Sequence, residues 1–168
     1  MKTIGMFYGT GTGKTANVAK KIKEAFGEAA IEVVSVENAT SKDFEKYENL
    51  LLGAATWFDG ELPSFWDELI PELDSLVLKD KKVAIFGLGD QINYPENFVD
   101  GIGILAELLV SSGATVIGET SADGYHFEQS RALKDGKFMG LAIDIENQSD
   151  KTDERIRAWV EQLRKEFY

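Results

Sequence analysis

The chain has 168 residues, 43% of them hydrophobic, a composition typical of one globular domain spanning residues 1–168 rather than of a disordered chain. It contains no cysteine and a single histidine, which excludes disulfides, thiolate catalysis, cysteine-ligated zinc, iron–sulfur clusters and multi-histidine metal sites. Acidic residues outnumber basic ones by 29 to 18, for a formal net charge of −11, and this excess argues against a nucleic-acid partner because phosphate neutralisation needs a basic face.

The N-terminal segment does not have the pattern of a secretory leader. Its short apolar run meets Gly9 and Lys14 almost at once, and no stretch of the chain approaches the roughly 18 apolar residues of a membrane-spanning helix. We therefore expect a cytoplasmic protein that does not associate with membranes.

Six short apolar runs predict β-strands. Several of them are apolar at consecutive positions, which is typical of strands buried on both faces of a parallel sheet. The runs are Thr3–Tyr8, Ile31–Val36, Leu50–Ala55, Lys82–Leu88, Ala114–Gly118 and Phe138–Ile143.

Segments with helical periodicity lie between these runs. Their apolar stripes comprise Val18, Ile22, Ala25 and Phe26; Phe65, Leu69 and Leu73; Val99, Ile102, Leu105, Leu108 and Leu109; and Ile156, Trp159, Val160, Leu163 and Phe167. Gly27 and Gly113 follow the first and third stripes, as glycines that end helices do. Trp66 and Trp159 fall within helical segments, and we expect both in the core.

Strands that alternate with helices predict right-handed crossovers and an α/β fold. The expected architecture is a three-layer doubly wound sandwich with a five-stranded parallel sheet in the order 2-1-3-4-5. The stretch Thr120–Lys137 breaks this alternation, and a structureless loop of that length is unusual inside a compact domain. We interpret it as an insertion (about residues 120–137) that interrupts the last strand, leaving Ala114–Gly118 and Phe138–Ile143 as its two halves.

The first predicted strand runs directly into a turn that could bind an anion. The turn reads Tyr8-Gly9-Thr10-Gly11-Thr12-Gly13-Lys14-Thr15 and leads into a helix. Free N–H groups and the dipole at a helix N-terminus favour negative charge, glycines allow close approach, and threonines add hydroxyl donors. The alternative is an ordinary turn with Thr12 as the helix N-cap.

Two nucleotide-binding motifs do not match this turn. A Walker A loop needs a glycine where the chain has Tyr8, and no apolar strand ends directly in an aspartate that could hold magnesium. The dinucleotide motif needs a third glycine where the chain has Lys14. A mononucleotide phosphate bound without a metal therefore fits better than ATP.

Two aromatic residues follow neighbouring strands of the predicted sheet. Trp57 comes after the third strand and Tyr94 after the fourth, and both loops should lie beside the phosphate turn, at the carboxyl ends of the strands. An indole and a phenol on opposite loops can sandwich a flat ring. The alternatives are core packing for Trp57 and an ordinary surface aromatic for Tyr94.

Taken together, these motifs resemble flavodoxin, specifically the long-chain kind, over essentially the full length. The matching motifs are Phe7–Thr15, Thr56-Trp57, Gly60-Glu61-Leu62, Gly89-Asp90-Gln91, Tyr94, Asn97-Phe98, Thr120–Gly140 and Asp144–Arg155. The resemblance implies non-covalently bound FMN and one-electron transfer between redox proteins, not an enzyme with its own substrate. It also identifies the insertion as the feature that separates long-chain from short-chain members.

The resemblance implies a role for each part of the pocket. Residues 10–15 would hold the phosphate, Thr56 and Glu146 would lie near the ribityl chain, Trp57 and Tyr94 would cover the two faces of the ring, and main-chain groups would bond its edge, with Asn97 and Val99 close by. The full set is Thr10, Gly11, Thr12, Gly13, Lys14, Thr15, Thr56, Trp57, Phe58, Asp59, Gly60, Leu88, Gly89, Asp90, Tyr94, Asn97, Val99 and Glu146.

The expected function is that of a low-potential carrier shuttling between semiquinone and hydroquinone. Reduction to an anionic hydroquinone is opposed by nearby carboxylates, each costing roughly 1.7 kcal/mol at ~10 Å and an effective dielectric of ~20. Family members reorient a peptide beside the ring, which here would be Phe58–Asp59. Phe58 stands where asparagine or glycine is expected, and Leu88 replaces a polar residue, so we expect both to affect semiquinone stability.

The resemblance also implies partners: a ferredoxin/flavodoxin reductase-type donor and a redox-enzyme acceptor, docking transiently on a monomer through basic faces. The predicted docking rim is Asp59, Glu61, Asp67, Asp90 and Glu96. The single histidine, His126, is expected at the surface. A P-loop phosphotransferase and a receiver-type signalling module remain as alternatives, and a visible spectrum would separate them from a flavin carrier.

Overall fold

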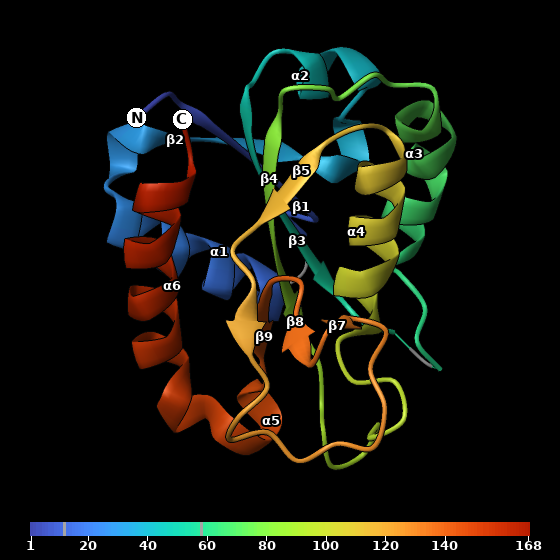
Figure 1. The fold of residues 1–168 in the computed structure, drawn as a ribbon, viewed down its shortest axis with the longest axis vertical. Helices are drawn as coiled ribbons and strands as arrows, with labels where there is room; N and C mark the ends of the chain where they lie inside the picture. The colour runs from blue at the N-terminus through green and yellow to red at the C-terminus, as the bar shows by residue number, and fades with distance from the viewer. Residues whose placement is uncertain (12, 58) are drawn as a thin grey trace.

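The computed structural model describes residues 1–11, 13–57 and 59–168, and its centre is a parallel β-sheet (Figure 1). The strands are, in spatial order, β2 (Ile31–Ser35), β1 (Ile4–Tyr8), β3 (Asn49–Ala55), β4 (Lys82–Leu88) and β5 (Thr115–Ile117). Neighbours in this row pair in parallel, so the predicted order 2-1-3-4-5 is confirmed. The carboxyl ends of β1, β3 and β4 therefore lie side by side at one edge of the sheet.

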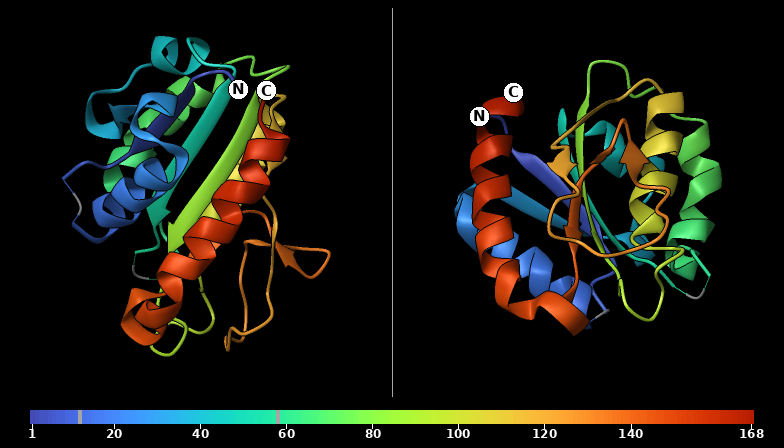
Figure 2. Two further views of the ribbon diagram at one scale, coloured as in Figure 1. Left: turned by 90° about the vertical axis from the view of Figure 1, so that its left-hand side faces the viewer. Right: turned by 60° about the horizontal axis from the view of Figure 1, so that its bottom comes forward.

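The last position of the sheet is filled by two separate strands. β5 pairs with Lys82–Ala84 of β4, and β9 (Leu141–Ile143) pairs with Phe86–Leu88 of the same strand. The predicted interruption of the last strand by an insertion is therefore confirmed. The insertion extends toward the end of the molecule where α5 (Ile145–Gln148) and the loop after β4 lie (Figures 1 and 2).

The predicted start of the second half, Phe138, is wrong. Lys137–Phe138 forms strand β8 of a small antiparallel sheet within the insertion, between β6 (Thr120–Ser121) and β7 (Leu133–Lys134). The Phe138 ring is fully buried against the rings of Phe98, Tyr125 and Phe127. Its apolar character therefore serves the core of the insertion, and the insertion reaches the start of β9.

Helices cover both faces of the sheet. On one face lie α1 (Gly13–Phe26) and α6 (Thr152–Glu166), and on the other lie α2 (Ser41–Glu45), α3 (Ser64–Asp74) and α4 (Asp100–Ser111) (Figures 1 and 2). Short 3₁₀ turns complete the described elements: η1 (Glu28–Ala30), η2 (Val36–Asn38) and η3 (Ser149–Lys151). The four predicted helices are present. The helices α2 and α5 were not predicted, because they have only five and four residues.

The buried side chains form one apolar layer on each face of the sheet. Trp66 and Trp159 are essentially unexposed, as expected, and their indole N–H groups donate to the carbonyls of Gly53 (3.2 Å) and Gly118 (2.8 Å). His126 is exposed, also as expected. Among the described residues, no helix is long and apolar enough to cross a membrane.

Candidate functional site

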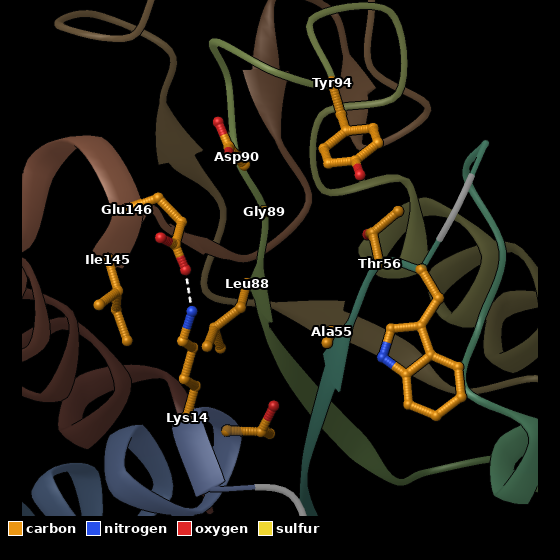
Figure 3. Close-up of a pocket in the computed structure, with 11 residues that line it drawn as sticks. Lys14, Ala55, Thr56, Leu88, Gly89, Asp90, Tyr94, Ile145 and Glu146 are labelled. Atoms are coloured by element: carbon orange, nitrogen blue, oxygen red, sulfur yellow. Dashed lines mark hydrogen bonds and ion pairs between the residues drawn. The ribbon is translucent and has the colours of Figure 1, made fainter.

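A pocket of about 330 Å³ opens at the carboxyl edge of the sheet, where β1, β3 and β4 end (Figure 3). It is lined by Lys14, Thr15, Ala55, Thr56, Trp57, Leu88, Gly89, Asp90, Tyr94, Ile145 and Glu146. The three strand-end segments singled out in the sequence thus meet in one cavity, and α5 closes a further side. Its volume falls at the lower end of the range of small-molecule sites.

One end of the pocket is the start of α1. The helix begins at Gly13, carries no acidic residue in its first turn, and places the buried Thr15 against the pocket. The positive end of its dipole is therefore not offset from within the helix. Lys14 and Glu146 form an ion pair across the cavity (Figure 3), so the ammonium charge is partly compensated.

The turn before α1 rests on a carboxylate from the neighbouring strand region. Glu37 accepts a hydrogen bond from the Gly11 N–H at 3.4 Å and one from the Ser35 hydroxyl, whose oxygen in turn accepts from Thr10 at 3.1 Å. Burial opposes ionisation of Glu37, but these hydrogen bonds outweigh it and lower the pKa of the carboxyl. Glu37 was not predicted, and its position after β2 gives no local indication of this contact.

The other end of the pocket is aromatic. Trp57 and Tyr94 both line the cavity while 37% and 52% of their surfaces remain exposed, which is unusual for side chains of this size. Trp57 is therefore not a core residue like Trp66. Figure 3 shows Tyr94 at the opposite end of the cavity from Lys14. An indole and a phenol from separate loops thus flank a space that a flat ring can enter.

The loop that carries Trp57, here called the indole loop (residue 57 and residues 59–61), is closed by its own main chain. The Trp57 N–H donates to the Glu61 carbonyl and the Glu61 N–H donates to the Trp57 carbonyl, both at 2.7 Å. Gly60 adopts a positive φ of 93°, which a side chain would strain. Asn97 donates to the Asp59 carbonyl and to the buried Asp100 carboxylate, each at 3.2 Å.

The loop that carries Tyr94, here called the phenol loop (residues 88–94), is held by a buried polar network. Asp144 is fully buried and accepts bonds from the Gln91 N–H at 3.1 Å, the Gln91 amide at 2.7 Å and the Asn147 N–H at 3.0 Å. The Gln91 side-chain oxygen accepts from the His126 N–H of the insertion at 2.5 Å. Gln91 and Asp144 were predicted only as parts of matching motifs and not as partners, although Asp144 directly follows a buried strand.

Asp90 belongs to the same loop and organises it. Its carboxylate accepts from the N–H groups of Ile92 (3.1 Å) and Asn93 (3.0 Å) and from the Asn147 amide (2.8 Å). Burial raises the pKa of Asp90, but the bonds from Asn93, Asn147 and Ile92 outweigh it and lower the pKa overall. In the predicted docking rim, Asp59, Glu61, Asp67 and Glu96 are exposed, whereas Asp90 is half-buried and occupied by these contacts.

The predicted site residues fall into four groups. Those that line the cavity are Lys14, Thr15, Thr56, Trp57, Leu88, Gly89, Asp90, Tyr94 and Glu146. Those that lie in the adjoining turns are Thr10, Gly11, Gly13, Asp59, Gly60 and Asn97. Val99 is fully buried as the residue before α4, and Thr12 and Phe58 lie outside the described residues. Ala55 and Ile145 line the cavity and were not predicted.

Comparison with known proteins agrees with this geometry. The family model described as Flavodoxin matches residues 6–159, which is most of the chain. The chain belongs to the flavodoxin family. It is 49% identical over 166 residues to a flavodoxin of a Nostoc species (99% of this chain, 98% of the relative) and 49% identical over 169 residues to a flavodoxin of Trichodesmium erythraeum (99% of each).

A solved structure of the family has the same fold over the whole chain. The crystal structure of Fusobacterium nucleatum flavodoxin bound to flavin mononucleotide superposes with a TM-score of 0.95, at 38% sequence identity and over 100% of both chains. Flavodoxins are electron-transfer flavoproteins, not substrate-turnover enzymes, and their cofactor is FMN. They act on redox partner proteins through transient contacts. The phosphotransferase and receiver alternatives are therefore set aside.

The residues present fit this cofactor. The first N–H groups of a helix have no partner within the helix, and at α1 they lie at the end where a phosphate would lie. A Cβ built at Gly13 meets no atom within 4 Å, so the helix start is open at that residue. At the other end the indole and phenol rings provide an apolar slot of the kind that stacks on a heterocycle.

Proposed function

We propose that the chain is a low-potential one-electron carrier that binds FMN non-covalently in this pocket and shuttles between the semiquinone and hydroquinone states. The observation that carries the proposal is that Trp57, Tyr94 and the first turn of α1 all line one cavity. The insertion between β5 and β9 supports assignment to the long-chain group of the family. The flavin, when bound, supplies the redox chemistry, and the chain supplies binding, orientation and electrostatics.

Each part of the pocket then has a binding role. Residues 10–15 hold the phosphate through N–H and hydroxyl groups, while Thr56 and Glu146 lie beside the ribityl chain. Trp57 and Tyr94 cover the two faces of the ring and exclude water from them. Main-chain groups at residues 58–60 and 88–90 bond the ring edge, with Asn97 and Val99 behind them.

Charge near the ring sets the direction of the potential. Asp90 lines the cavity, and its lowered pKa keeps the carboxylate ionised at neutral pH. A carboxylate at ~10 Å and an effective dielectric of ~20 disfavours a new negative charge on the flavin by roughly 1.7 kcal/mol. Since ~1.4 kcal/mol corresponds to ~59 mV for one electron, a few such groups lower the second reduction potential by the order of 100 mV.

Electron exchange would take place at the exposed edge of the pocket. The exposed carboxylates of Asp59, Glu61, Asp67 and Glu96 suit basic faces of a reductase-type donor and of a redox-enzyme acceptor. Such contacts are expected to be transient, with association rates that fall steeply as salt rises.

Reconstitution of the purified chain with FMN tests the proposal. We expect bound-flavin absorption bands at about 375 and 450 nm, and weaker binding of riboflavin, which lacks the phosphate. A spectroelectrochemical titration should place the second electron below the potential of free FMN. Failure to take up FMN would overturn the proposal, and a second potential equal to that of free FMN would overturn its low-potential part.

A further inference from the structure

An aromatic ring outside the cavity lining lies between the two ends of the pocket. Phe65, the second residue of α3, is half-buried, and its ring centroid is 6.2 Å from that of Trp57 with the planes at 82°. This is the edge-to-face arrangement that aromatic pairs favour. The indole that lines the cavity therefore has a second ring against it on the side of α3.

The same ring is seated on the turn that precedes α1. A Cβ built at Gly9 would overlap the Cζ, Cε1 and Cε2 atoms of Phe65. Gly9 does not have a positive φ, so its requirement for glycine comes from space rather than from backbone conformation. Phe65 thus contacts the turn at one end of the pocket and the indole at the other.

Phe65 is held on a firmly anchored helix. Pro63 precedes the first residue of α3, and the adjacent Trp66 is fully buried with its N–H bonded to the Gly53 carbonyl at 3.2 Å. Leu69 and Leu73, further along the same helix, are also buried. Because α3 cannot rotate without exposing these side chains, the Phe65 ring has a fixed base from which to act.

We infer that Phe65 is a positioning residue: seated on Gly9, its ring sets the orientation of the Trp57 indole and links the phosphate end of the pocket to its aromatic wall. The link to a flavin rests on the proposed function, whereas the link between Gly9, Phe65 and Trp57 does not. A displacement of the turn at Gly9 therefore moves the indole, although the two residues lie in different loops.

The first test uses the apoprotein, so that it does not depend on cofactor binding. Near-UV circular dichroism and tryptophan fluorescence of Phe65→Ala are compared with the parent, with Trp57→Phe in each background to isolate the Trp57 contribution. We expect Phe65→Ala to change that contribution and Phe65→Tyr, which keeps the ring, to restore it. Ile70→Ala, a half-buried aliphatic on the same helix, is the matched control and should leave it unchanged. An unchanged Trp57 contribution in Phe65→Ala overturns the inference.

The second test uses the glycine. Gly9→Ala should alter the Trp57 signals in the same apoprotein measurements, because the new methyl group displaces the ring. Gly13→Ala, at the first residue of α1 and with no atom within 4 Å of the added carbon, is the control and should not. In the Gly9→Ala/Phe65→Ala double variant the ring is gone, so the alanine at position 9 should cause no further change. Additive effects would show that the two residues act separately and would overturn the inference.

Titration with FMN and with riboflavin separates this inference from the proposed function. If Phe65 acts through the indole, Phe65→Ala should weaken both flavins by a similar factor, about two- to tenfold. If the apoprotein signals move and neither flavin binds even the parent chain, the positioning role stands and the proposed function fails. If both flavins bind the parent and Phe65→Ala equally tightly, the positioning role fails and the proposed function stands.

Discussion

The two loops that flank the ring end of the pocket are held in different ways. The indole loop is closed by paired main-chain bonds between Trp57 and Glu61, leads within a few residues into α3, and has Phe65 of that helix against its indole. The phenol loop depends on residues far along the chain, since Gln91 bonds to Asp144, 53 positions later, and to the main chain of His126 in the insertion.

This difference separates two kinds of vulnerability. A loop held by its own backbone and by ring contacts can lose a side chain without leaving a buried polar group unpaired. A loop held by a buried carboxyl group cannot lose that group without leaving the buried donors around it unpaired. We therefore expect substitutions under the phenol loop to act mainly on stability, and substitutions in the indole loop to act mainly on ligand affinity.

The largest expected effect is that of Asp144→Ala. The change removes the acceptor for the N–H groups of Gln91 and Asn147 and for both of their amide side chains, and the Gln91 donors are buried. The free energy of unfolding of the apoprotein, measured with urea at pH 7, should fall by about 3 kcal/mol. The exposed Asp150→Ala is the control, with an expected change within about 0.5 kcal/mol. A loss below about 1 kcal/mol for Asp144→Ala would remove the distinction between the two loops.

Alkaline pH tests the support of the phenol loop, because ionisation of Tyr125 should destabilise the neighbouring insertion. Burial raises the pKa of Tyr125 to about 12, and its hydroxyl donates to the Ala142 carbonyl at 2.6 Å. The pKa of Tyr125 in the folded chain lies above the unfolded value of about 10, so the buried neutral phenol stabilises the fold fully below pH ~10. This contribution to the free energy of unfolding, about 2–3 kcal/mol, is lost as pH rises toward 12.

The measurement is the difference in unfolding free energy between the parent chain and Tyr125→Phe as a function of pH. Tyr8 and Tyr47 also have raised pKa values, through burial first, but they are present in both proteins and cancel in the difference. The difference should shrink, or reverse in sign, between pH 10 and 12. A difference that does not vary over this range would contradict the assignment.

Trp57→Ala tests whether the indole loop contributes mainly to ligand affinity rather than to stability. Loss of the indole removes one wall of the cavity but no buried charge, so FMN affinity should fall about tenfold while the unfolding free energy of the apoprotein changes by less than about 1 kcal/mol. Tyr94→Ala, which removes the more exposed of the two rings, should have a smaller effect on affinity. Titration of the apoprotein by flavin fluorescence measures both. If Trp57→Ala destabilised the apoprotein as much as Asp144→Ala, the two loops would not differ as described.

The fold could be predicted largely because each strand has a sequence pattern that can be recognised without the others. Leu50–Ala55 is apolar at consecutive positions since both faces of β3 are covered, and this pattern needs no knowledge of the neighbours. Phe138 was assigned to the wrong strand for the same reason. The sequence pattern of an apolar residue beside a strand is the same whether that residue is buried in the main sheet or in a small sheet of the insertion. The five-residue α2 is too short for periodicity to reveal.

The candidate site could be predicted where the relevant residues sit together in the chain. The glycine and threonine turn, Trp57 and Tyr94 each lie in the segment that follows a strand, so topology alone brings them to one edge. The roles of Gln91 and Asp144 were found only in the structure, because they depend on a hydrogen bond between residues 53 positions apart. Phe65 appeared in the sequence only as part of a helical stripe, whereas its contacts with Gly9 and Trp57 follow from how α3 packs.

The smallest expected effect concerns Asp90, the most solvent-accessible carboxylate of the phenol-loop network. Burial works against ionisation, but the bonds from Asn93, Asn147 and Ile92 outweigh it, so the folded pKa lies below the ordinary value. The ionised carboxylate therefore stabilises the fold fully above the ordinary carboxyl pKa, and this stabilisation is lost as pH falls through the lowered pKa.

Urea unfolding of the parent chain and of Asp90→Asn from pH 7 to pH 3 measures this effect. The difference between their free energies of unfolding should narrow on acidification. Glu32, Glu37 and Asp153, whose pKa values are also lowered, titrate in both proteins and cancel. A difference independent of pH would mean that Asp90 stabilises the loop by shape rather than by charge, and would confine the polar support of this loop to the buried Asp144.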